Sequence, residues 1–283
     1  MIRRRRGGWL TPLMVVVALL ALLDQFARSA VEVAVPDYAR DQPFAEDLDV
    51  AVRDLRTRGP RAAADGWLEV LHSGRQVAAA DVLRIAGARG QPSAFFTYDI
   101  DGRDRATASA MGTDWRHHIV NGYLVGYRPY EASNLLEPLQ VLALRKRYQY
   151  DHLQYAGRQE VWQTSEQAFV APRGDCEDHA LALADWLIEQ GEDARVVLGQ
   201  YRGGGHAWVV LLRDGQAYLL EATRKQGVTG RFRYPLARLK TDYHPEMMFN
   251  RHAFWVNTGS RLTTDYQGPR WQRRSQFTPG ATF

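Results

Sequence analysis

Cys176 is the single cysteine of the chain, and it opens a predicted helix between Asp175 and Glu177. A thiol in the first turn of a helix meets unpaired backbone N–H groups and the positive end of the helix dipole, which favour a thiolate. The backbone N–H of such a residue also points outward, where it can stabilise an oxyanion. A free cysteine is often only a small buried hydrophobic residue, but acidic neighbours are unusual in a core. We therefore interpret Cys176 as a nucleophile.

His206 is the predicted base. It follows three glycines and opens a predicted strand that ends at Arg213. A glycine run lets the backbone pass close to other groups, so a histidine beside it can face a cleft. The chain has eight histidines, and the choice among them needs a geometric test.

The next strand supplies that test. Asp214-Gly215 predicts a two-residue hairpin turn, and the register that follows from it pairs His206 with Thr223. Glu221 then lies on the same face as His206, one diagonal step away. Such an acid would orient the imidazole as the third member of a catalytic triad. The alternative is a strand-end carboxylate that pairs with Arg224 or solvent.

Three acids surround the cysteine: Asp175, Glu177 and Asp178. Like charge near a thiol raises its pKa. One interpretation is that Asp175 caps the helix and Asp178 accepts hydrogen bonds from donors of the first turn. Calcium is the alternative, because clustered carboxylates suit a hard cation. His179 should lie near Asp175 and Glu177, and we interpret it as structural.

The elements around these residues predict an α+β core. Apolar residues at helical spacing favour helices over residues 135–148 and 176–190, the second ended by Gly191. Strands are expected over residues 194–201, 206–213 and 216–222. The helix that bears the cysteine would pack on this antiparallel sheet.

Three sequence blocks carry a family resemblance: Gly174 to Ala180 (GDCEDHA), Gly205 to Val209 (GHAWV) and Leu219 to Thr223 (LLEAT). Together they resemble the transglutaminase-like superfamily, in particular bacterial periplasmic transglutaminase-like cysteine peptidases. The similarity covers roughly residues 135–223, with a weaker echo over residues 243–259. The resemblance implies a papain-like fold and acyl transfer through a thiol. Family members often carry Asp where this chain has Glu221.

The resemblance also implies an oxyanion hole and a metal. Family members place a polar or indole donor before the cysteine, which would be Gln163 or Trp162 here. We favour Gln163, since packing is the commoner role of a tryptophan. Some related bacterial peptidases look calcium-dependent, which would place calcium at Asp175, Glu177 and Asp178. Catalysis through the thiol requires no other cofactor.

The N-terminus predicts export. Arg3 to Arg6 precede the apolar run Trp9 to Leu23, as in an export signal. The run is short for a membrane span of about 20 residues, so both an anchor and a signal cleaved after Ser29 stay open. The positive-inside rule places the remaining chain across the membrane. We expect a protein anchored in the inner membrane and facing the periplasm, or secreted to the periplasm.

Composition bounds the remaining possibilities. The chain has 283 residues, 45% hydrophobic and 24% charged, and a formal net charge of +4. The sequence has no long stripe of basic residues, so we expect no nucleic-acid partner. A chain with one cysteine cannot form an intrachain disulfide. The predicted divisions are a signal or anchor (1–30), a mixed region of unknown role (31–130), the catalytic domain (131–260) and a tail (261–283). Within them we expect helix over residues 43–90 and strands over 94–100 and 119–127. The segment from Tyr234 onward is rich in aromatic residues and Arg, and we expect it either to wall the substrate cleft or to cover the sheet, with packing as the default.

These features predict an exported cysteine-dependent acyl-transfer enzyme. The first hypothesis is a peptidase or amidase that acts on envelope proteins or peptides. Protein-glutamine transglutamination would use the same triad, with an amine in place of water as acceptor. A catalytically inactive envelope scaffold or binding module is the third hypothesis.

Overall fold

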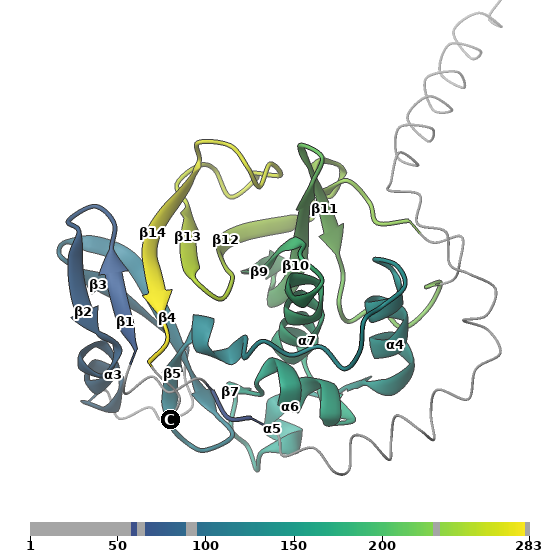
Figure 1. The fold of residues 1–283 in the computed structure, drawn as a ribbon, viewed down its shortest axis with the longest axis horizontal. Helices are drawn as coiled ribbons and strands as arrows, with labels where there is room; N and C mark the ends of the chain where they lie inside the picture. The colour runs from purple at the N-terminus through teal and green to yellow at the C-terminus, as the bar shows by residue number, and fades with distance from the viewer. Residues whose placement is uncertain (1–57, 61–65, 89–94, 229–232, 281–283) are drawn as a thin grey trace, which may run out of the picture.

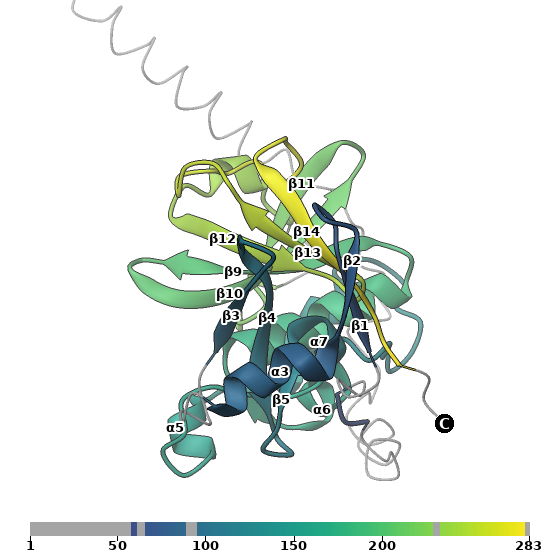
Figure 2. The same cartoon turned by 90° about the vertical axis from the view of Figure 1, so that its left-hand side faces the viewer.

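The chain folds into a large antiparallel sheet with helices gathered on one side, as Figures 1 and 2 show in two orientations of the computed structural model. The structure describes residues 58–60, 66–88, 95–228 and 233–280. The large sheet has eight strands, in spatial order β11 (Gln216–Leu220), β10 (Gly204–Arg213), β9 (Asp193–Tyr201), β12 (Tyr243–Phe249), β13 (Ala253–Asn257), β14 (Trp271–Thr278), β1 (Trp67–Val70) and β2 (Arg75–Ala78).

A second sheet and several helices complete the mixed α+β architecture. The second sheet contains β3 (Phe96–Ile100), β4 (Arg103–Gly112), β5 (His117–Ile119) and β7 (Val161–Trp162), and a parallel pair joins β6 (Arg147–Tyr148) to β8 (Arg173–Gly174). The helices are α3 (Ala79–Ala88), α4 (Glu137–Arg145), α5 (Asp151–Gln154), α6 (Ser165–Val170) and α7 (Cys176–Glu189), with 3₁₀ turns at Val120–Tyr123 and Ala237–Leu239.

Helix α7 lies at the centre of the core. It packs against β9 and β10 on one side and against α4 and α6 on the other, and side chains such as Leu183 and Leu187 are fully buried. Each such side chain contributes roughly 1.5–3 kcal/mol by leaving water. Gly191 ends the helix with a φ of 86°. The predicted helix over residues 176–190 is thus confirmed almost to its last residue.

The hairpin of β10 and β11 has the predicted register. Asp214 and Gly215 have φ values of 51° and 69°, as a type I′ turn requires. Arg213 pairs with Gln216, and the ladder continues to Val209 opposite Leu220. Because β11 ends at Leu220, the first residues of β10 extend beyond it toward the site.

The helix expected over residues 43–90 is wrong for its middle part. β1 and β2 form a hairpin through the turn at Ser73-Gly74, and of the residues described in this range only those of α3 are helical. Burial in β1 alternates with period two, from the half-exposed Trp67 to the buried Leu68 and Val70. That period fits a strand, and β1 pairs with β14 from the far end of the chain. Residues 43–57, 61–65 and 89–90 lie outside the described residues.

In the second sheet, β3 and its turn at Asp101-Gly102 match the prediction. The strand expected over residues 119–127 does not form, because β5 ends at Ile119 and a 3₁₀ turn follows. Strand β4 was not predicted. Its apolar residues are mainly small, such as Ala106, Ala108 and Ala110, and these carry little strand preference.

The predicted boundaries near residues 130 and 260 do not fall at breaks in the structure. β1 and β2 precede the first boundary and β14 follows the second, yet all three belong to the same sheet as β9 to β13. The expected tail therefore contributes a strand instead of covering the sheet. The predicted signal or anchor at residues 1–30 lies outside the described residues. Of the helices that the structure describes, none has the length and apolarity needed to cross a bilayer.

Candidate active site

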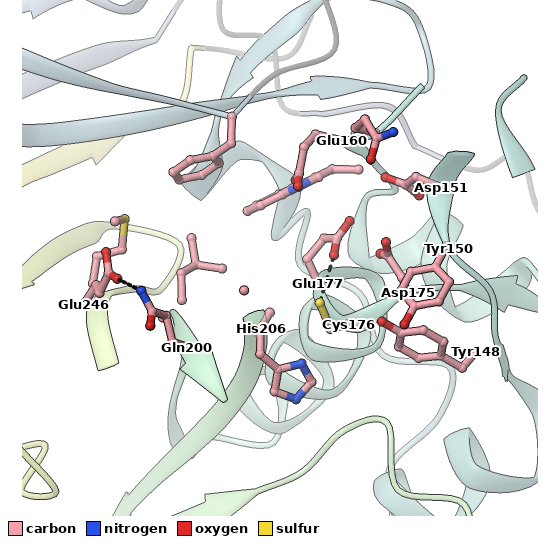
Figure 3. Close-up of a pocket in the computed structure, with 18 of the residues that line it drawn as sticks. Tyr148, Tyr150, Asp151, Glu160, Asp175, Cys176, Glu177, Gln200, His206 and Glu246 are labelled. Carbon is pink, nitrogen blue, oxygen red and sulfur yellow. Dashed lines mark hydrogen bonds between the residues drawn. The ribbon is translucent and has the colours of Figure 1, made fainter. Parts of the chain in front are cut away.

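Cys176 and His206 line one pocket of about 540 Å³ (Figure 3). The first turn of α7 supplies Cys176, and the free end of β10 supplies His206. The other walls come from the ends of β9 and β12 and from the segment that leads from β6 to β7. The hairpin and the helix thus bring the predicted nucleophile and base to a common cavity.

Glu221 binds His206, as the predicted register requires. The Nε2 atom of His206 donates to Oε2 of Glu221 at 2.9 Å. This pairing leaves Nδ1 of the imidazole to accept a proton. Burial favours a higher pKa for Glu221, but hydrogen bonds from His206, Thr223 and Tyr243 outweigh it and lower the pKa to about 2. Glu221 is therefore an ionised carboxylate that fixes one ring nitrogen of His206.

Two residues that sequence reasoning missed hold this carboxylate. Thr223 donates its hydroxyl and its backbone N–H to Oε1 of Glu221, at 2.6 and 3.1 Å. The hydroxyl of Tyr243 donates to Oε2 at 2.7 Å, and its ring stacks on Tyr201 with centroids 4.3 Å apart. Thr223 was visible as the predicted strand partner of His206, whereas no local signal links Tyr243 to Glu221.

The thiol of Cys176 forms hydrogen bonds with Glu177 and Ala207 instead of His206. Sγ donates to Oε2 of Glu177 at 3.4 Å and is hydrogen-bonded by the backbone of Ala207. Within the described chain, no hydrogen bond joins Sγ to the imidazole. Burial and the negative charge of Asp175 raise the pKa of the thiol to about 12, which opposes the predicted thiolate.

The strand geometry explains this separation. Side chains alternate along β10, so Ala207 faces the core around α7 while His206 shares the opposite face with Trp208. Sγ lies against the backbone of Ala207, the residue next to His206.

Helix capping falls to Asp178 and not to Asp175. Asp175 occupies the N-cap position of α7, but its side chain makes no capping hydrogen bond. The Asp178 carboxylate accepts from the backbone of Gln163 at 2.8 Å and from that of Asp175. It lies close to the buried Lys146 ammonium, since both groups crowd the position that a Cβ on Gly174 would take.

A carboxylate cluster behind the cysteine has the features of a cation site. One oxygen each of Asp151, Asp175 and Asp178 lies within 4.8 Å of the others. Each of the three buried side chains has an oxygen without a hydrogen-bond partner, Oδ1 of Asp151 and Asp175 and Oδ2 of Asp178. Such orphaned oxygens fit a hard cation. Glu177, predicted as a ligand, groups instead with Asp175 and Cys176, and Asp151 was not predicted.

The charge of this carboxylate cluster depends on the nearby Lys146 ammonium and on repulsion among the aspartates. Burial lowers the pKa of Lys146, while the nearby aspartates oppose that shift. Its ammonium donates to Oε1 of Gln163 and to the carbonyl of Arg173, at 3.1 and 2.8 Å. Burial also raises the pKa of Asp151 and of Asp175. Negative charge on the buried cluster is therefore unfavourable, and bound protons, the Lys146 ammonium or a metal cation can offset it.

The structure does not place the amide of Gln163 in the pocket. Its NH₂ group donates to Tyr155 and to the carbonyl of Arg173, at 3.0 and 3.1 Å. Both donors are used, so this residue does not supply the predicted oxyanion donor. Trp162 does line the pocket, and its Nε1 donates to Oε2 of Glu160 at 3.4 Å. Of the two predicted donors, only Trp162 is near Cys176.

His179 has a structural position, as predicted. It is buried; its Nδ1 donates to the carbonyl of Asp175 at 2.6 Å, and its Nε2 accepts from Lys225 at 2.9 Å. Burial lowers its pKa to about 3, and the charge of Lys225 adds to this effect. A neutral ring in this position ties the first turn of α7 to the segment after β11.

The part of the chain that contains the site is similar to known proteins. Residues 160–272 match the family model of the CEP76 peptidase-like domain. The "Centrosomal protein of 76 kDa" of Xenopus tropicalis is 33% identical over 106 residues, which make up 36% of this chain and 16% of that protein. This chain therefore spans only a small part of that relative.

Two solved structures of Legionella pneumophila LapG are also similar. One has 17% identity and a TM-score of 0.36, and covers 44% of this chain and 68% of LapG. The calcium-bound form has 17% identity and a TM-score of 0.36, and the similarity covers 48% of this chain and 75% of LapG. The segment that the family model matches contains Cys176, His206 and Glu221. Residues 160–272 are thus similar to the CEP76 peptidase-like domain.

Proposed function

We propose that this protein is a cysteine-dependent acyl-transfer enzyme, a peptidase or amidase with Cys176 as nucleophile, His206 as base and Glu221 as the residue that orients His206. The observation that carries the proposal is the His206–Glu221 hydrogen bond of 2.9 Å in the pocket that Cys176 also lines. A base with one nitrogen fixed by a carboxylate and the other free is what thiol activation requires.

In the proposed reaction, substrate binding turns Cys176 away from Glu177 and toward His206. Nδ1 takes the thiol proton as Sγ attacks the acyl carbon. The carbon–nitrogen bond breaks when the imidazolium returns that proton to the leaving amine, which leaves a thioester on Cys176. His206 then deprotonates a water molecule that attacks the thioester, and the acid product and the free thiol are released. The backbone N–H of Cys176 is the first proposed oxyanion donor, and Nε1 of Trp162 is the second, once its single N–H releases Glu160.

We place this activity in the cell envelope, on protein or peptide substrates. The support is the basic and apolar N-terminal segment, Arg3 to Leu23, which predicts export through or anchoring in the inner membrane. Calcium is a proposed accessory ion, which Asp151, Asp175 and Asp178 would hold. When bound, such an ion supplies positive charge that offsets the carboxylates beside the thiol.

Acylation by a p-nitrophenyl ester, followed by intact-protein mass spectrometry, tests the chemistry directly. We expect one acyl group on Cys176, and a His206→Ala variant that acylates at least about a hundredfold more slowly. His252→Ala is the control, because His252 is exposed and outside the pocket. Cys176→Ser should give no thioester.

A non-catalytic binding module is the second candidate. The observation that favours it is the protonated thiol, with its hydrogen bond to Glu177 and its pKa raised to about 12. Equal acylation rates in the wild type and the His206→Ala variant would support this candidate and exclude the peptidase.

A further inference from the structure

The pocket beside Cys176 is lined on several sides by carboxylates. Its acidic lining residues are Asp151, Glu160, Asp175, Glu177 and Glu246, and no Lys or Arg is among the described residues that line it. Glu246 is partly neutralised, since it accepts from Arg105 at 3.2 Å and from Gln200 at 3.4 Å. No Lys or Arg of the described chain lines the cavity beside the other four acids, and the buried Lys146 ammonium behind the cavity acts on three of them, Asp151, Asp175 and Glu177.

Two of these acids have unused hydrogen-bonding capacity. Oε1 of Glu177 and Oδ1 of Asp175 have no hydrogen-bond partner, although the side chains are only 5% and 8% exposed. Both residues line the cavity, and Figure 3 shows the Glu177 carboxylate projecting into it beside Cys176. The Glu177 and Asp175 side chains share a hydrogen bond with each other. Their remaining oxygens lack a donor, which is unfavourable for buried carboxyl groups.

Aromatic rings frame the same wall. Trp162 lines the pocket, and its indole donates to Glu160, which keeps that carboxylate near the pocket. Phe95 stacks on Trp162 with centroids 5.9 Å apart, and Tyr150 lies across the cavity. Carboxylates combined with indole and phenyl faces form the surroundings that ammonium and guanidinium groups favour.

We propose that this wall binds the side chain of a Lys or Arg residue in the polypeptide substrate, between Glu160 and Glu177 and against Trp162. The inference rests on the proposed function and adds its substrate class. An organic cation fits this wall better than a metal ion, because calcium takes 6–8 oxygen ligands and the wall offers two carboxylates, a thiol and carbon-rich rings. A cavity of about 540 Å³ also has room for a long side chain.

Charged methanethiosulfonate reagents test the proposal at the single cysteine without any need for turnover. The thiolate attacks the reagent, a sulfur–sulfur bond forms to Sγ, the bond to the sulfonyl group breaks, and methanesulfinate leaves. We expect the aminoethyl reagent to react at least about tenfold faster than the sulfonatoethyl reagent, after each rate is divided by its rate with free N-acetylcysteine amide. The uncharged methyl reagent should fall between them.

Three variants test whether Glu160 and Glu177 cause the preference for the cationic reagent. Glu177→Gln and Glu160→Gln should each reduce the ratio of rates at least about threefold. Glu131→Gln is the matched control, because Glu131 is exposed and outside the pocket. Glu160 is only half-buried, so its variant remains informative if Glu177→Gln does not fold. A ratio near one in the wild type, or one unchanged in both pocket variants, overturns the proposal.

Further measurements separate this inference from the proposed function. Fluorogenic peptides that differ only in Lys, norleucine or Glu near the scissile bond should show a lower KM for Lys, and this advantage should shrink in Glu160→Gln. Turnover of all peptides with equal KM overturns the inference and leaves the peptidase standing. A reagent preference without turnover of any peptide supports the cation site and counts against the peptidase. A preference that occurs only in chelator and disappears at micromolar calcium identifies a metal site and overturns the inference.

Discussion

The carboxylate of Glu221 accepts four hydrogen bonds, from His206, Tyr243 and two groups of Thr223. A carboxylate held in this way has little freedom to turn, so the imidazole plane that it fixes has little freedom as well. The longer side chain of Glu, compared with the Asp common in similar proteins, is accommodated because donors meet both of its oxygens. The site therefore includes Thr223 and Tyr243, which hold Glu221, in addition to Cys176, His206 and Glu221.

Tyr243→Phe should weaken catalysis while the fold is kept. The change removes one donor from Oε2 of Glu221, which raises the pKa of Glu221 and loosens its hold on His206. A hydrogen bond to a charged group is worth roughly 1.5–3 kcal/mol, and about half of that is expected to act on the transition state, so kcat should fall about threefold to tenfold. Tyr201→Phe, in the stacked partner ring, should leave kcat unchanged; an equal fall of kcat in both variants would contradict a specific role for Tyr243.

Glu221 should also make stability depend on acid pH. Its pKa in the folded state is about 2, below the ordinary value of 4.5, so its contribution is present above pH 4.5 and is lost as the pH falls toward 2. At 1.36 kcal/mol for each pKa unit, the loss amounts to about 3 kcal/mol at most. Urea unfolding of the wild type and Glu221→Gln at several pH values measures it. Parallel curves for the two proteins between pH 5 and pH 2.5 would exclude this linkage.

Among the elements, the first turn of α7 is the most crowded. A side chain at Gly174 would collide with the Asp178 carboxylate and the Lys146 ammonium, and both groups are buried. We expect Gly174→Ala to lower the free energy of unfolding by roughly 1–3 kcal/mol, as overpacking does. Gly205→Ala is the matched control, since a Cβ at Gly205 meets no atom within 4 Å. Equal unfolding midpoints for the two variants would show that the site around Lys146 is looser than the structure implies.

The elements near the site were the most predictable from sequence. Periodic apolar residues mark α7, and the turn at Asp214-Gly215 sets the register that brings Glu221 to His206. These are local signals that act over a few residues. Tyr243 and Asp151 were not predicted, because they reach the site through pairings between distant segments. β1 was mistaken for helix for the same reason, since its partner β14 lies about 200 residues later.

In the whole molecule, one buried carboxylate connects several of these distant segments. Asp185 of α7 accepts from the backbones of Gly126 and Tyr127, at 2.9 and 2.8 Å, and from the hydroxyl of Ser165. Arg251, in the turn between β12 and β13, pairs with the other oxygen of Asp185 at 2.5 Å and also with Glu189. No sequence pattern predicted this network, because its members are spread over more than 120 positions.

Arg251→Leu should destabilise the protein by roughly 3–5 kcal/mol, because it leaves the fully buried Asp185 without its counter-charge. The double variant Asp185→Asn/Arg251→Leu should recover part of that loss, since an amide carries no charge and can still accept from Gly126 and Tyr127. Urea unfolding of both single variants and the double variant gives the coupling energy. Additive losses would mean that Arg251 acts through Glu189 or through packing. A coupling above about 1 kcal/mol would show that the ion pair itself holds the helix that carries Cys176 to the sheet that carries His206.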